Sequence, residues 1–306
     1  MRPLVYPSDW MFRPDPPPLE HFGRRFLAEG DSWFTISTLN LFESSNVLFK
    51  LAFDSSAVVI NCAYPGDTLQ RMVDCMGDVY FDRLLRQRAF AERWDALLIS
   101  AGGNDMIDAA QLPFKDKKGQ PTPVDHRLLL TPDEAALAIG AAGPARYLSE
   151  AGWTRLADYL LANISELVRR RDQGKNKARP IFLHTYALPT VRPSGTLGAA
   201  DGWLHPTFVA YDIPDFERQG LSDLLFQRLR QLLLDLDQDC GKPTALPQVH
   251  VFDSAGLTDI DRAQPEDTGK SGDWINEIHL SSSGYAKMGQ AFGAMIDRVL
   301  FSYSRP

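Results

Sequence analysis

Five short apolar runs recur along the chain, and they constrain its fold more than any other feature. They lie at residues 25–29, 57–62, 95–101, 180–186 and 249–253. Runs of this length are typical of strands buried on both faces. Segments with helical apolar spacing separate them, at about residues 39–53, 68–72, 81–94, 153–171, 221–239 and 282–300. This alternation predicts a parallel, doubly wound sheet with helices on both faces.

The remaining segments favour one domain with additions over two separate domains. Residues 1–22 hold six prolines among aromatic residues, which favours an arm laid over the domain surface. We expect residues 23–306 to form a single domain, with insertions at about 106–150 and 189–219. The first insertion includes a short predicted helix near 132–139. No internal repeat or clean linker divides the sequence.

Charge and hydropathy exclude several classes of protein. The formal net charge is −7 and no Lys/Arg stripe offsets it, so we expect no nucleic-acid partner. No stretch approaches the roughly 20 apolar residues of a membrane span. Residues 1–18 lack the apolar core of a signal peptide, so we expect a cytoplasmic protein unless a dedicated system exports it. Three cysteines without metal-like spacing suit a reducing compartment.

Polar turns follow three of the predicted strands. Gly30-Asp31-Ser32 ends the first, Gly66 follows the second, and Gly102-Gly103-Asn104-Asp105 ends the third. Because ligands bind beyond the carboxyl ends of strands in such sheets, these turns are expected to gather along one edge. A histidine, His279, precedes the last predicted helix. A serine is a weak nucleophile until a base takes its proton, so Ser32 and His279 are the candidate pair.

In this order the segments resemble the four sequence blocks of the SGNH hydrolases, also called the GDSL esterase/lipase family. Those blocks are an early Gly-Asp-Ser, a central Gly, a Gly-x-Asn-Asp and a late Asp-x-x-His. The resemblance spans residues 25–300 outside the two insertions. It implies a flavodoxin-like three-layer α/β/α sandwich around a central parallel five-stranded sheet. It also implies a carboxylic ester hydrolase that acts on small-molecule esters through an acyl-serine intermediate.

The same resemblance assigns roles to individual residues. Ser32 would be the nucleophile and His279 the general base, and the oxyanion hole would consist of the Ser32 and Gly66 backbone N–H groups and the Asn104 side chain. The chemistry agrees, because acyl transfer develops negative charge on one oxygen, where removing one fixed donor costs about 2.7–4 kcal/mol in subtilisin. Asp31 and Asp105 are expected to fix turns through nearby backbone N–H groups.

One position departs from the family pattern. Three residues before His279 the family has Asp, whereas this chain has Asn276. An amide oxygen can still accept from the imidazole Nδ1–H and hold the ring, although it cannot stabilise imidazolium by charge. Three interpretations stay open: Asn276 orients His279, Glu277 or Asp273 supplies a carboxylate instead, or Ser32 and His279 act as a dyad. We favour Asn276.

Aromatic residues near the site are candidates for substrate contacts, namely Trp33, Trp203 and Phe208. Packing of the second insertion onto the body is the favoured interpretation of the last two, because large apolar side chains are usually buried. His184 and His205 lack metal-like spacing and are expected to be structural. We therefore expect no metal and no cofactor. Two other functions remain alternatives: a metal-dependent phosphoesterase, or a binding protein that keeps the hydrolase fold without the chemistry. Oligomeric state, acyl chain length and alcohol moiety do not follow from the sequence.

Overall fold

A six-stranded parallel sheet forms the centre of the molecule in the computed structural model, which describes residues 1–35, 45–74, 76–137, 140, 142–196 and 200–303. The strand order is β1-β3-β2-β4-β5-β6. The strands are β1 (Leu4–Pro7), β2 (Arg24–Gly30), β3 (Ala57–Asn61), β4 (Ala96–Ser100), β5 (Ile181–His184) and β6 (Val249–Phe252). The predicted parallel, doubly wound α/β sheet is confirmed.

The predicted number of strands is wrong by one. The proline-rich arm contributes β1, which pairs in parallel with β3 from Leu4 opposite Val58 to Pro7 opposite Asn61. Because β1 is an edge strand, its outer side needs no ladder partner, and an edge position tolerates a proline. The five predicted strands lie within one to two residues of the observed ends.

Nine α-helices occur among the described residues: α1 (Val47–Lys50), α2 (Leu69–Val73), α3 (Val79–Arg86), α4 (Gly103–Gln111), α5 (Pro132–Leu137), α6 (Glu150–Arg171), α7 (Leu204–Ala210), α8 (Asp215–Leu234) and α9 (Ser282–Tyr303). Helices α4 and α7 were not predicted. The predicted helix at 81–94 ends at Arg86, because Gln87 is already extended. Part of the predicted segment 39–53 lies outside the described residues.

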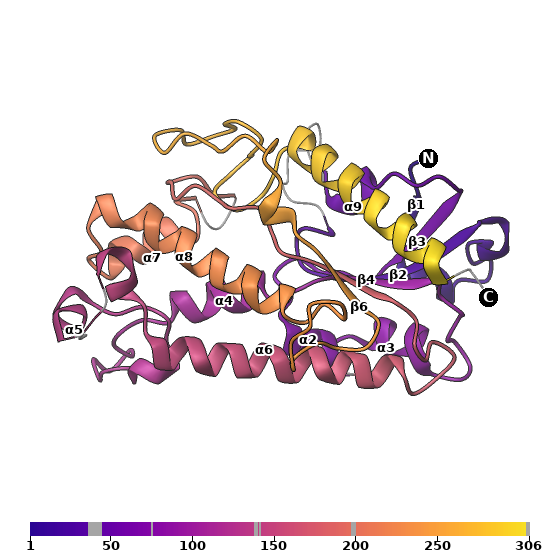
Figure 1. The fold of residues 1–306 in the computed structure, drawn as a ribbon, viewed down its shortest axis with the longest axis horizontal. Helices are drawn as coiled ribbons and strands as arrows, with labels where there is room; N and C mark the ends of the chain where they lie inside the picture. Colours follow the sequence, from indigo (N-terminus) through magenta and orange to yellow (C-terminus); the bar gives the residue numbers. More distant parts are fainter. Residues whose placement is uncertain (36–44, 75, 138–139, 141, 197–199, 304–306) are drawn as a thin grey trace.

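The helices cover both faces of the sheet (Figure 1). Helix α9 lies on one face, where α1 contacts it, and α2, α3 and α6 lie on the other face. Glycines let α9 approach the end of α1 and the segment that follows it. A Cβ at Gly289 would lie 2.6 Å from the Lys50 backbone, and one at Gly293 would lie 2.3 Å from the Ala52 carbonyl oxygen. Among the described helices, none is long and apolar enough to cross a lipid bilayer.

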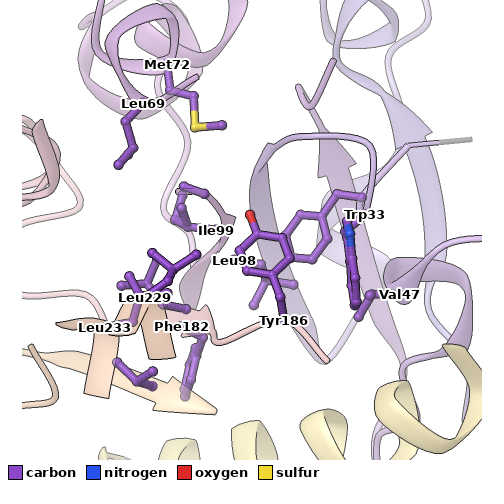
Figure 2. Close-up of a cluster of buried hydrophobic side chains, with 14 of the residues drawn as sticks. Trp33, Val47, Leu69, Met72, Leu98, Ile99, Phe182, Tyr186, Leu229 and Leu233 are labelled. Atoms are coloured by element: carbon purple, nitrogen blue, oxygen red, sulfur yellow. The ribbon is translucent and has the colours of Figure 1, made fainter. Parts of the chain in front are cut away.

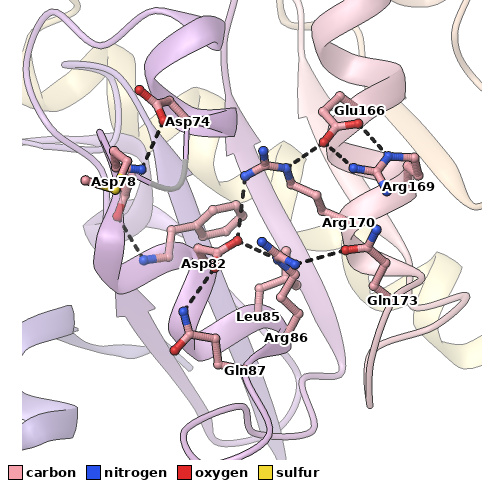
Figure 3. Close-up of polar contacts among 12 residues, drawn as sticks. Asp74, Asp78, Asp82, Leu85, Arg86, Gln87, Glu166, Arg169, Arg170 and Gln173 are labelled. Atoms are coloured by element: carbon pink, nitrogen blue, oxygen red, sulfur yellow. Dashed lines mark hydrogen bonds and ion pairs between the residues drawn. The ribbon is translucent and has the colours of Figure 1, made fainter.

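Apolar side chains from the sheet and both helical layers meet in one continuous core. Figure 2 shows part of it, with Leu98 and Ile99 of β4 near Phe182 of β5 and Leu229 of α8, and with Trp33 beside Tyr186. Polar contacts hold α3 to α6. Asp82 of α3 lies 3.6 Å from Nη1 of Arg170 in α6. Within α3, Asp82 also accepts from Arg86 Nε at 2.5 Å. Figure 3 shows both contacts.

The chain reverses direction across the sheet at β2. From β2 it crosses to β3 on one side, and then returns to β4 on the other side of β2. Ligand sites in open parallel sheets lie outside the carboxyl ends of strands at such a switch point. The loops that follow β2, β3 and β4 therefore mark the place to examine for a site.

Candidate active site

The turn after β2 holds Ser32 against the neighbouring strand. The backbone N–H of Asp31 donates to the Ser100 carbonyl oxygen at 3.1 Å, which continues the ladder one residue beyond β2. A Cβ at Gly30 would lie 2.7 Å from the Ser100 Cβ and carbonyl oxygen. Glycine is therefore required at this position because the two backbones approach too closely for any side chain.

Asp31 fixes the turn, as expected from the sequence. Its Oδ1 accepts from the Trp33 backbone N–H at 2.9 Å and from Ser100 Oγ at 2.7 Å, and its Oδ2 accepts from the Tyr186 hydroxyl at 2.5 Å. Burial raises the pKa of Asp31 to about 6, although each of these hydrogen bonds lowers it. All three donors converge on one carboxylate, so they hold the turn in one conformation.

His279 lies in the loop before α9 and reaches Ser32 from the far end of the sequence. Its Nε2 is 2.7 Å from Ser32 Oγ. The imidazole is 4% exposed, and burial lowers its pKa to about 4. Burial disfavours the charged form, so the ring is neutral near pH 7 and its Nε2 can accept the serine proton.

Asn276 sets the tautomer of that ring. Its Oδ1 accepts from the backbone N–H groups of Ile278, at 3.1 Å, and His279, at 2.9 Å. Backbone N–H groups only donate, so this atom of the amide is the oxygen. The His279 Nδ1 lies 3.1 Å from the same oxygen and must therefore carry the proton. The Nε2 lone pair is left to face Ser32.

The two alternative carboxylates are engaged elsewhere. Glu277 accepts from the backbone N–H groups at the start of α7, those of Trp203, Leu204 and His205. Burial raises its pKa to about 7 against the effect of these bonds. Asp273 accepts from Lys287 Nζ at 2.6 Å and Ser283 Oγ at 2.7 Å. Among these residues, only Asn276 has a hydrogen bond to the His279 ring in the structure.

Asn104 shares a cleft with Ser32, whereas Gly66 does not line it. The cleft is narrow and largely apolar, and its lining is Asp31, Ser32, Trp33, Gly103, Asn104, Ile107, Tyr186, Ala187, Pro189, Phe226 and Ile278. Asn104 Nδ2 donates to the Asp67 carbonyl oxygen at 3.0 Å, which ties the start of α4 to the loop after β3. Gly66 precedes Asp67 in that loop and is exposed, with φ of +82°.

The three aromatic candidates occupy different places. Trp33 lines the cleft and is 4% exposed. Trp203 is half-buried, and its indole meets the His279 ring edge to face with centroids 5.4 Å apart. Phe208 is fully buried within α7 and is absent from the cleft lining, so the structure gives it a packing role.

Sequence reasoning missed most of the apolar cleft lining. Ile107 lies in α4, Ala187 and Pro189 follow β5, and Phe226 lies in α8, so three further chain segments meet at the turn that carries Ser32. Only Tyr186 carried a usable signal, because it follows the carboxyl end of a strand as Ser32 and Asn104 do.

A second Ser–His pair lies in the core beneath the site. His184 Nε2 is 2.9 Å from Ser100 Oγ, and both side chains are fully buried. Burial lowers the pKa of His184 to about 3. The Asp31 carboxylate accepts from Ser100 rather than from His184, so the imidazole has no acidic partner to orient it. Because both side chains are fully buried, no substrate can reach the pair. His184 is structural, as predicted.

Two groups of side chains in the described part of the chain could hold a metal ion by proximity: Glu29 with Asp67 and Asp78, and Asp237 with Asp239 and His250. None of these residues lines the cleft at Ser32.

Searches with family models and among curated proteins find no match for this chain. Solved structures do match. The chain is similar to an extracellular lipase from Streptomyces rimosus, with 12% identity and a TM-score of 0.45 over 92% of this chain and 100% of that one. A carbohydrate acetylesterase from Sinorhizobium meliloti matches with 12% identity and a TM-score of 0.42, over 90% and 99%. The aryl esterase of M. smegmatis matches with 12% identity and a TM-score of 0.41, over 92% and 99%. Likenesses at this level do not identify the function of the chain.

Proposed function

We propose that this protein is a serine esterase of the SGNH hydrolase type, which cleaves carboxylic esters of small molecules without a metal at the reacting atoms. The observation that carries the proposal is the relay from Asn276 Oδ1 to His279 Nδ1 and from His279 Nε2 to Ser32 Oγ. Nucleophile, base and orienting group lie within hydrogen-bond reach of one another, which is the geometry that nucleophilic catalysis by serine requires.

Acylation would proceed as follows. His279 Nε2 takes the Ser32 Oγ proton while Oγ attacks the ester carbonyl carbon. The resulting imidazolium then gives this proton to the departing alcohol. A water molecule, activated by the same Nε2, cleaves the acyl-serine and restores the enzyme. Two transient charges develop in these steps, the imidazolium of His279 and the oxyanion of the tetrahedral intermediate, and Asn276 orients the imidazolium but does not neutralise it.

Stabilisation of the oxyanion falls to neutral donors. One N–H of the Asn104 amide donates to the Asp67 carbonyl oxygen, and the same nitrogen has a second N–H to offer the substrate. We assign the backbone N–H groups of Ser32 and Gly66 to the same role. The Asn104–Asp67 bond supports this assignment, because it links the amide donor to the loop that carries Gly66.

Labelling with a fluorophosphonate tests the proposal directly. We expect intact-protein mass spectrometry to show one adduct and peptide mapping to place it on Ser32, together with turnover of p-nitrophenyl acetate. A metal-dependent phosphoesterase would instead turn over p-nitrophenyl phosphate and leave Ser32 unlabelled. Absence of both turnover and adduct would favour a binding protein on this fold.

A further inference from the structure

Three carboxylates from separate segments lie close together near the carboxyl end of β2, outside the cleft that contains Ser32. Glu29 lies at the end of β2, Asp67 precedes α2, and Asp78 caps the N-terminus of α3, where Figure 3 shows it. One oxygen from each lies within 4.8 Å of the others. Glu29 is fully buried and Asp67 is 5% exposed, whereas Asp78 is half-buried.

Their hydrogen bonds leave a buried oxygen without a partner. Glu29 Oε1 accepts from the Gly30 backbone N–H at 2.8 Å, but Glu29 Oε2 is buried with no hydrogen-bond partner among the described residues. Asp78 Oδ1 accepts from the Phe81 backbone N–H at 2.8 Å. A buried carboxylate oxygen with no donor is costly, because water no longer solvates it and nothing replaces the water.

The surrounding protein supplies little positive charge. Arg71 Nε lies 3.2 Å from Asp67 Oδ1, but the Arg71 side chain is 57% exposed. Within the described ranges, no ion pair reaches Glu29 or Asp78. Either a proton or a cation must therefore offset the charge of this group.

We propose that Glu29, Asp67 and Asp78 bind one hard divalent cation of the Ca²⁺ or Mg²⁺ class between the end of β2 and the starts of α2 and α3. Carboxylate oxygens are the ligands that these ions prefer, and the group offers no nitrogen or sulfur. The unpartnered Glu29 Oε2 supplies a coordinating atom that no hydrogen bond competes for. This inference does not depend on the proposed esterase activity.

Such a cation would fix the loop beside the active site. The Asp67 carbonyl oxygen accepts from Asn104 Nδ2 at 3.0 Å, so the residue that would bind the ion with its side chain also holds Asn104 with its backbone. The cation would join the end of β2 directly to the starts of α2 and α3. Binding that favours the folded state stabilises it by mass action.

The second proximal group provides a matched control. Asp237 Oδ2 accepts from the Val251 backbone N–H at 2.8 Å, and Asp237 Oδ1 accepts from the Asp239 backbone N–H at 2.9 Å. His250 Nε2 lies 3.0 Å from the Tyr303 hydroxyl. These contacts occupy the Asp237 carboxylate and the His250 Nε2, so we expect no tight binding there.

Calorimetric titration and thermal unfolding of the full chain test the site. After EDTA treatment and dialysis at pH 8, CaCl₂ or MgCl₂ is added to the wild type and to Glu29→Gln, Asp78→Asn and Asp239→Asn. We expect one saturable site in the wild type and a rise in Tm of roughly 2–4 °C at saturation. Glu29→Gln and Asp78→Asn should weaken binding at least about tenfold, since each removes a charged ligand. Asp239→Asn should bind like the wild type.

Several outcomes would overturn the proposal. Absence of heat and of a Tm shift with both ions would mean that a proton shared by Glu29 and Asp78 offsets the charge instead. Loss of binding in Asp239→Asn with retention in the other two variants would move the site to the second group. Asn caps helices as well as Asp does, so Asp78→Asn keeps α3 intact and decides the question even if Glu29→Gln does not fold.

Discussion

The Nδ1 atom of His279 lies 3.1 Å from the Oδ1 atom of Asn276, and two backbone N–H groups identify that atom as the amide oxygen. The contact fixes the neutral tautomer that the proposed catalysis needs. In a serine protease, an Asp→Asn change at the orienting position costs about 10⁴ in rate because the amide selects the wrong tautomer. Here the loop holds the Asn276 amide with its oxygen toward His279 Nδ1. An asparagine in this position can therefore orient the imidazole as an aspartate would.

Loss of the nucleophile or the base should abolish ester hydrolysis. We expect Ser32→Ala and His279→Ala each to lower kcat/KM for p-nitrophenyl acetate by roughly 10⁴- to 10⁶-fold, because the two residues act as one unit. Ser100→Ala is the matched control from the buried Ser–His pair. It should lower the Tm while keeping fluorophosphonate labelling; loss of labelling in Ser100→Ala with retention in Ser32→Ala would reverse the assignment.

Removal of the orienting group should cost less than removal of the base. We expect Asn276→Ala to lower kcat about 10²- to 10³-fold with little change in KM, below the roughly 10⁴ that a charged partner is worth. Asp273→Asn and Glu277→Gln should have far smaller effects on kcat, since neither side chain reaches the imidazole. A larger loss in either of these two variants than in Asn276→Ala would contradict the orienting role of Asn276.

The pH dependence of the rate should reflect the low pKa of His279. The base works only when neutral, so kcat/KM should hold as pH falls and should decline around pH 4, where burial places the pKa. Between about pH 6.5 and 4 the unfolded chain binds more protons at this residue than the folded chain. Its contribution to stability is therefore complete above about pH 6.5 and is lost as pH falls through 4.

A carboxylate at position 276 should shift the acidic limb of the kcat/KM pH profile, which is its decline at low pH. In Asn276→Asp a negative charge would face the imidazole and favour its protonated form, so the pKa of His279 rises. We expect the acidic limb of the kcat/KM profile to shift to higher pH and kcat at pH 8 to increase, because the imidazolium formed during acylation gains a charged partner. An unchanged profile would show that residue 276 does not contact the working form of the base.

Asn104 should contribute to the transition state rather than to substrate binding. Replacing it with alanine removes one fixed oxyanion donor, which is worth about 10²–10³ in kcat. We expect a loss of this size for Asn104→Ala, with little change in KM. A rise in KM at constant kcat would show instead that Asn104 binds the ground state.

Local sequence was sufficient for the strands that run through the middle of the sheet. The run Ala57–Asn61 is β-branched and buried, and no helical pattern competes with it. Strand β1 has only four residues and ends at Pro7, so its own residues do not predict a strand. It forms because the arm pairs with β3 in the tertiary structure. Helix α7 is a similar case, since the carboxylate that accepts from the N–H groups at its start belongs to Glu277, more than 70 residues away.

The sequence by itself determined the order of the chemistry along the chain: a serine, a glycine and an asparagine at three strand ends and a histidine before the last helix. Ser32 and Asn104 converge because parallel pairing brings the carboxyl ends of β2 and β4 to one edge of the sheet, and His279 reaches Ser32 from the loop before α9. Only the tertiary structure decided which neighbour orients His279. Asn276, Glu277 and Asp273 lie within six residues of it, and their roles differ because a hydrogen bond depends on where each side chain points, which sequence spacing in an irregular loop does not specify.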